Sequence, residues 1–112
     1  MTDDDFRALA LGLPEVSEGE HAGCATFAVR GRRFATLGWP APGKVSLVLG
    51  PEELELLLET CPAAIERAPG AWGRRGHCRL DLAAADEATV RGAIAMAWRR
   101  SAPSRLARSS PA

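Results

Sequence analysis

Apolar residues recur at the spacing of an amphipathic helix in three parts of the chain. These repeats are Phe6, Leu9, Ala10 and Leu13, then Leu54, Leu57, Leu58 and Cys61, and finally Val90, Ala93, Ile94, Ala97 and Trp98. Thr2 can cap the first repeat, and Pro14 stops it. Pro51 opens the second repeat, Pro62 ends it, and Asp86 can cap the third. The pattern therefore predicts three helices, near the start, in the middle and near the end of the chain.

The segments between these repeats are short and apolar, or they alternate between apolar and polar residues, as strands do. They comprise residues 26–29, 34–39, 45–49 and 77–82, with a further short strand near 65–68. Gly31 lies between the first two and is a hairpin signal. Alternation in the last long segment places Cys78 on its apolar face and His77 and Arg79 on the other. We expect the polar, acidic stretch 15–21 to be a connection.

The predicted order of elements is one helix, three strands, a helix, one or two strands and a last helix. Runs of consecutive strands favour an antiparallel sheet, and three amphipathic helices can cover one of its faces. The sequence thus predicts a two-layer α+β fold with helices packed on one face and the other face comparatively open. The 112 residues are enough for one domain. We expect it to span 1–101, with a frayed tail over 102–112.

The charges balance over the whole chain but not within each half. Fourteen Lys and Arg residues face fourteen Asp and Glu residues, so the formal net charge is zero. Residues 1–60 hold 10 acids and 5 bases, and residues 61–112 hold 4 acids and 9 bases. A zero total argues against a chain that binds nucleic acid or a membrane surface through its overall field. The uneven distribution of charge between the halves is still compatible with a local basic surface.

The N-terminus and the cysteines bear on the compartment. Asp3, Asp4 and Asp5 stand where a secretory signal would be basic, and no apolar run is long enough to span a membrane. The three cysteines form no CxxC motif and cannot all pair within one chain. We expect a cytoplasmic protein without a membrane partner.

Residues that could support catalysis or bind a metal are few. Cys78 and His77 are neighbours in sequence, but strand geometry turns them to opposite faces, which is unfavourable for a nucleophile and its base. His21 and Cys24 add two zinc-type ligands, although neither pair has the spacing of a common zinc site. We therefore expect a protein that is not an enzyme and that has no metal and no cofactor.

The segment 68–79 is the most distinctive part of the chain. Within it Trp72 precedes Arg74 and Arg75, and His77 and Arg79 follow. Its glycines would let the backbone approach a partner closely, and exposed arginines can bind phosphates in a bidentate manner. A second basic group, Arg30, Arg32 and Arg33, lies at the predicted hairpin. The competing interpretation has Trp72 packed on the rim of the core, with Arg74 and Arg75 neutralised by Glu18 and Glu20.

Several motifs along residues 2–101 point to a known family. They are Leu11-Gly12-Leu13-Pro14, Glu18-Gly19 with His21 and Gly23, Phe27-x-Val29-x-Gly31-x-x-Phe34-Ala35, Pro51-Glu52-Glu53, Ala68-Pro69-Gly70-Ala71-Trp72-Gly73-Arg74-Arg75-Gly76, and Ala97-Trp98. In these motifs the chain resembles the MmcQ/YjbR family of small bacterial proteins, and the segment around Trp72 is the most specific of them. The resemblance implies a two-layer α+β fold with an antiparallel sheet, akin to secretion-chaperone-like and frataxin-like folds.

Members of that family are commonly labelled DNA-binding, with the hairpins of the sheet acting as wings, and the family brings no catalytic residues. For this chain we expect weak, phosphate-mediated binding of DNA. The expected contacts are Arg74, Arg75, Arg79, His77, Trp72, Arg30, Arg32 and Arg33. The alternative is a non-enzymatic protein-interaction or chaperone-like module that uses the open sheet face or the acidic stretch 15–20. In either case we expect a monomer or a weak dimer.

Overall fold

The computed structural model describes residues 1–108, which form a six-stranded sheet and five helices. The strands are β1 (Val16–His21), β2 (Cys24–Val29), β3 (Arg32–Leu37), β4 (Lys44–Val48), β5 (Ile65–Arg67) and β6 (His77–Asp81). The helices are α1 (Asp3–Leu11), α2 (Pro51–Thr60), α3 (Gly70–Arg74), α4 (Glu87–Ser101) and α5 (Ser104–Arg108). The sheet order is β1-β2-β3-β4-β6-β5, and every neighbouring pair is antiparallel.

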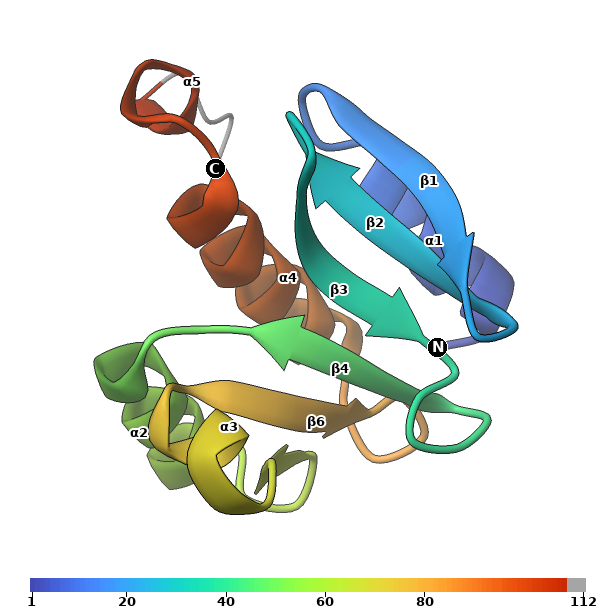
Figure 1. Cartoon of the computed structure of the whole chain (residues 1–112). Helices are drawn as coiled ribbons and strands as arrows, with labels where there is room; N and C mark the ends of the chain where they lie inside the picture. Colours follow the sequence, from blue (N-terminus) through green and yellow to red (C-terminus); the bar gives the residue numbers. More distant parts are fainter. Residues whose placement is uncertain (109–112) are drawn as a thin grey trace.

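Helices α1, α2 and α4 pack on one face of this sheet, so the predicted two-layer α+β fold is confirmed (Figure 1). The core lies between the two layers. Phe6 of α1 meets Phe27 of β2 edge to face, with the ring centroids 5.8 Å apart. Trp98 of α4 is fully buried, and its indole Nε1 donates a hydrogen bond to the carbonyl oxygen of Pro14 at 3.0 Å. We call the other side of the sheet the open face.

The predicted caps are present at the helix ends. The Thr2 hydroxyl accepts a hydrogen bond from the Asp5 amide at 3.1 Å, and the Asp5 carboxylate accepts one from the Thr2 amide. The Asp86 carboxylate accepts a hydrogen bond from the Thr89 amide at 2.7 Å at the start of α4. These contacts satisfy backbone donors that a helix leaves free in its first turn. They fix where α1 and α4 begin.

Residues 16–21 form strand β1, so the prediction of a connection there is wrong. The strand pairs with β2 along its length, and a two-residue hairpin of Ala22 and Gly23, both at positive φ, joins the two. β1 is an edge strand and is exposed except at Val16, so few of its side chains need to be apolar. This is why the alternation that marks a half-buried strand is absent from its sequence.

Two short helices lie where none was predicted. Helix α3 occupies five residues of the Trp72 segment, and it lies on the near side of β6 in Figure 1. Helix α5 lies within the predicted tail, and its Leu106 and Ala107 pack against the core. The rest of that tail, 109–112, lies outside the described residues. Five residues span less than two helical turns, which is too few for a periodic pattern.

Candidate functional site

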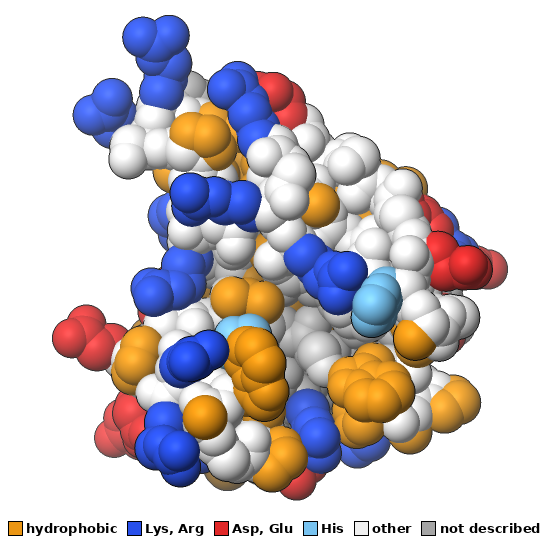
Figure 2. Space-filling view, in the orientation of Figure 1, with side chains coloured by type: hydrophobic (Ala, Val, Ile, Leu, Met, Phe, Trp, Pro, Cys, Tyr) orange, Lys and Arg blue, Asp and Glu red, His pale blue; other side chains and the backbone are white. Residues whose placement is uncertain are grey.

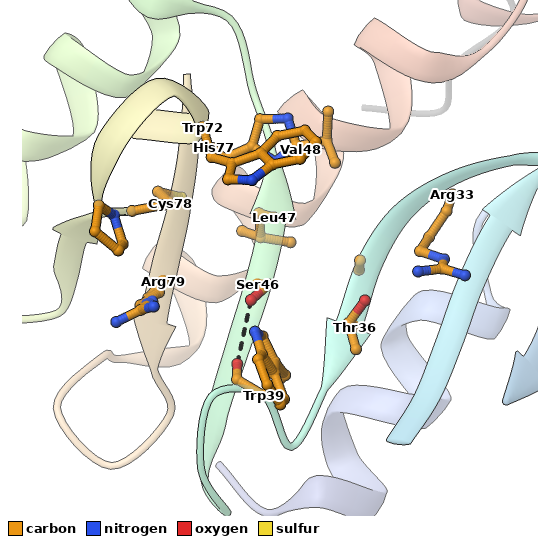
Figure 3. A pocket seen from close by; sticks show the side chains of 13 residues that line it. Arg33, Thr36, Trp39, Ser46, Leu47, Val48, Trp72, His77, Cys78 and Arg79 are labelled. Atoms are coloured by element: carbon orange, nitrogen blue, oxygen red, sulfur yellow. Dashed lines mark hydrogen bonds between the residues drawn. The ribbon is translucent and has the colours of Figure 1, made fainter. Parts of the chain in front are cut away.

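A groove of about 450 Å³ runs across the open face, and we call it the sheet groove. It is lined by Arg33, Ala35, Thr36, Trp39, Ser46, Leu47, Val48, Ala68, Pro69, Trp72, His77, Cys78 and Arg79. Figure 3 shows the side chains of Trp39 and Trp72 at this groove, near Ser46 and near Val48 respectively. None of the described residues that line the groove is Asp or Glu.

Strand register determines which side chains the floor of the groove presents. Thr36 pairs with Ser46, and Ser46 pairs with Arg79, so these three residues form one row across β3, β4 and β6. Val48 pairs with His77 in the next row along β4 on the same face. The burial pattern of β6 confirms the predicted alternation, with His77 and Arg79 on the open face. The floor is therefore polar at one row and carries an imidazole at the next.

Arg33 reaches this face because of a β-bulge in β3. Phe27 pairs with Ala35, but Ala28 pairs with Arg33, so the pairing passes over Phe34. Phe34 and Ala35 are consequently both buried, and Arg33 lies on the open face beside Ala28. Without the extra residue, alternation would turn Arg33 toward the core.

Trp72, Arg75 and His77 form a cluster at one side of the groove. The Arg75 guanidinium lies over the Trp72 ring, 5.3 Å from its centroid, in cation–π geometry. The imidazole of His77 lies against the same indole, with ring centroids 5.0 Å apart. Burial, and then the positive charge of Arg75, lower the pKa of His77 below its ordinary value of 6.5. The imidazole is therefore mainly neutral at pH 7.

Trp39 stands at the other side, and sequence reasoning assigned it no role. It lies just after β3, and its carbonyl oxygen accepts a hydrogen bond from the Ser46 hydroxyl at 3.2 Å. Trp39 and Arg33 also line a smaller adjoining hollow of about 250 Å³ that includes His21. The signal for Trp39 was its place next to a proline- and glycine-rich turn, where a large aromatic residue is seldom fully covered.

The structure separates the three hairpin arginines that the sequence grouped together. Arg30 forms a bidentate ion pair with Glu15, with Nε–Oε1 and Nη2–Oε2 distances of 2.8 and 3.0 Å. Arg32 pairs in register with buried Val29 and so projects from the helix-covered side. Of the three, only Arg33 lines the groove. On the other segment, Arg79 lines the groove, while Arg74 is exposed at the end of α3.

The acids of the first half do not neutralise the arginines around Trp72. Glu18 pairs with Arg7 at 3.1 Å, and no ion pair between described residues includes Arg74 or Arg75. The competing interpretation of these arginines is therefore wrong. Arg33 and Arg79 likewise take part in none of the ion pairs within residues 1–108. In Figure 2 the acidic side chains of this view lie toward its periphery, and basic ones surround the hollow.

Two glycines of the Trp72 segment, Gly73 and Gly76, have a different role from the one predicted. Gly73 and Gly76 are buried rather than open to a partner. A Cβ on Gly73 would lie 1.9 Å from the carbonyl oxygen of Ala68. One on Gly76, whose φ is +106°, would lie 2.4 Å from the carbonyl oxygen of Leu49. These glycines let α3 pack closely on the chain's own backbone, and this packing positions Trp72.

The cysteines and histidines do not come together as a metal site. No group of three or more His, Cys, Asp or Glu side chains within the described part of the chain could hold a metal ion. Cys78 lies on the buried face of β6, opposite His77, and burial raises the pKa of its thiol to about 12. Among the described helices, none has the length and the apolar character needed to cross a membrane.

Comparisons with known proteins give the family and support the fold. The family model YjbR matches residues 11–100. The chain belongs to the YjbR family.

Its fold is similar to the crystal structure of the Deinococcus radiodurans protein DR2400, which carries a DUF419 domain. The TM-score is 0.64 at 23% sequence identity, over 84% of this chain and 76% of that one. No curated protein matches the chain. The sheet groove thus lies on the open face of a YjbR domain.

Proposed function

We propose that this YjbR protein acts by binding rather than by catalysis, and that it binds DNA weakly through contacts to phosphates in the sheet groove. The observation that carries the proposal is the charge of the groove. Arg33 and Arg79 line it from β3 and β6, none of its described lining residues carries a carboxylate, and neither guanidinium is in an ion pair with a described acid. Unpaired guanidinium groups in a concave surface favour an anionic ligand.

The groups around Trp72 extend this positive surface. Arg75 and Arg74 lie at the end of α3, on the same side of the sheet as the groove (Figure 1). Arg30 and Arg32 do not contribute, because one is engaged by Glu15 and the other projects from the opposite side. The expected phosphate contacts are therefore Arg33, Arg75 and Arg79, with Arg74 at the rim. We place this activity in the cytoplasm.

Replacing the two arginines of the groove tests the proposal. The Arg33→Ala/Arg79→Ala variant is expected to bind DNA about tenfold less tightly or worse at low salt, because each arginine supplies a charge-assisted contact to a phosphate. The matched control is Arg32→Ala/Arg91→Ala, which removes the same charge from groups outside the groove. Fluorescence anisotropy of a labelled oligonucleotide measures both. Equal binding by the two variants, or no binding by the parent protein, would overturn the proposal.

A further inference from the structure

Two indole side chains, Trp39 and Trp72, stand exposed at the sheet groove. Their exposed fractions are 53% and 58%, whereas Trp98 is fully buried. The other exposed large hydrophobic residues among those described are Leu11 and Leu56, on α1 and α2. Isolated leucines are normal on a protein surface. Two indoles at one groove instead mark a surface that gains free energy when a flat apolar group covers it.

The backbone of Trp39 and the indole of Trp72 each contact the strands that form the floor of the groove. Ser46 of β4 donates a hydrogen bond to the backbone of Trp39, and His77, the cross-strand partner of Val48, packs on Trp72. The rows of Ser46 and Val48 are two residues apart along β4, which is about 7 Å in a strand. Stacked bases in a duplex are about 3.4 Å apart and hide their faces from side chains. Figure 3 shows the Trp39 and Trp72 side chains at separate places, near Ser46 and near Val48 respectively, so each indole is available to a base that is not stacked on its neighbour.

Positive charge accompanies these aromatic platforms. Arg75 lies over Trp72, and Arg33 and Arg79 line the groove beside the two indoles. The nearest acid by register is Glu66, which pairs with Arg79 across β5 and β6, but no ion pair links them within the described chain. Aromatic side chains in a positively charged groove are the means by which single-stranded nucleic acid is bound without base-pair readout.

We propose that the sheet groove binds single-stranded DNA, with unpaired bases stacked on Trp39 and Trp72 and phosphates beside Arg33 and Arg79. The inference rests on the proposed function and specifies its ligand. The arginines alone would bind single strands and duplexes through the same phosphates. The two indoles provide the preference, because only an unpaired strand exposes base faces to them.

The experiment compares a single-stranded oligothymidylate with a duplex of equal length. The parent protein is expected to bind the single strand more tightly, and the exposed indoles to lose fluorescence as it binds. Trp39→Ala and Trp72→Ala are each expected to weaken single-strand binding by about fivefold to a hundredfold, with little effect on the duplex. Trp39→Phe and Trp72→Phe, which keep an aromatic face, should retain most of the affinity. Leu56→Ala, which removes an exposed hydrophobic side chain on α2, is the matched control, and urea unfolding checks that each variant folds.

The outcomes separate this inference from the proposed function. If the duplex binds as tightly as the single strand and the tryptophan variants behave like the parent, base stacking is overturned while DNA binding stands. If the parent binds neither oligonucleotide, both fail. Displacement of the oligothymidylate by an equal charge concentration of polyglutamate would also overturn the inference, because a groove that stacks bases discriminates against an anion without them.

Discussion

The alternation of side chains along β6 gives His77 and Cys78 opposite environments although they are adjacent. Cys78 lies on the buried, helix-covered face of the sheet, and His77 lies in the groove against Trp72. The charged group that acts on His77 is Arg75, the residue that follows α3; Arg79 lies two positions along the same strand, and the neighbour of His77 on β4 is the uncharged Val48. Burial and Arg75 hold its pKa below 6.5, so the free protein carries a neutral imidazole at pH 7. A phosphate bound in the groove would raise the pKa of His77, because a nearby anion favours the charged imidazolium over the neutral imidazole.

Binding of oligothymidylate is therefore expected to tighten as the pH falls from about 7.5 to about 5.5, since the complex takes up a proton that the free protein does not hold. His77→Gln should lose most of this increase, and anisotropy titrations at several pH values measure it. His21→Gln, in the adjoining hollow, is the control for the second imidazole. The same pH profile in the His77→Gln variant and the parent would contradict the assignment. The folding stability of the free protein changes in the opposite direction. Because the pKa of His77 is lower in the folded state than in the unfolded state, folding becomes less favourable as the pH falls through the pKa of the unfolded state.

Among the secondary-structure elements, helix α3 is held in position by close backbone contacts. It carries Trp72 and ends at Arg74, and its position is set by Gly73 against Ala68 and by Gly76 against Leu49. In each case the neighbouring atom is a backbone carbonyl oxygen, which cannot move aside as a flexible side chain can. The motif that looked most like a ligand-binding loop in the sequence is thus, in its glycines, a packing motif. The residue of α3 that lines the groove is the exposed Trp72.

Gly73→Ala and Gly76→Ala are each expected to lower the free energy of unfolding by about 2 kcal/mol or more, because the added Cβ overlaps backbone atoms. Urea unfolding followed by circular dichroism measures the change. The control is Gly92→Ala on α4, where a Cβ would have nothing within 4 Å. That substitution should stabilise the protein by about 0.5–1 kcal/mol, as alanine favours a helix over glycine. A Gly73→Ala protein as stable as the parent would show that α3 does not need this contact.

For the molecule as a whole, the distribution of charge over the surface affects anion binding more than the net charge does. The chain is neutral overall, and many of its charges cancel locally: Glu15 pairs with Arg30, Glu18 with Arg7, and Glu53 with Arg100. Within residues 1–108, the arginines that line the groove form no ion pair, and no acid lines it. Under the proposed function, a neutral protein of this kind would attract DNA through a local patch rather than a long-range field, so it would contact few phosphates.

The dependence of binding on salt is expected to be shallow for this reason. Two to four phosphate contacts predict a slope of about −2 to −4 in a plot of log affinity against log salt concentration. The Arg33→Ala/Arg79→Ala variant should lower the magnitude of that slope by about one to two, while Arg32→Ala/Arg91→Ala should leave it unchanged. Titrations at a series of salt concentrations measure it. A slope near zero in the parent would mean that phosphates are not the ligands of the groove.

Local sequence determined most of the elements of this protein. Apolar periodicity gave the three long helices, caps at Thr2 and Asp86 gave the starts of two of them, and Gly31 gave the hairpin between β2 and β3. Alternation in β6 also gave the faces of His77 and Arg79 correctly. These features depend on residues a few positions apart, so a pattern read along the chain contains them. The same reasoning identified Trp72 and its neighbours as a candidate surface.

Tertiary structure alone decided how that surface is completed. The bulge at Phe34 turns Arg33 into the groove, strand order brings Trp39 to it, and the pairing of Glu18 with Arg7 leaves Arg74 without that acid. Each outcome depends on residues that are distant in sequence and meet only when the sheet forms. A register shift, a charge partner and a shared groove have no local pattern, because their energies are set by contacts across strands.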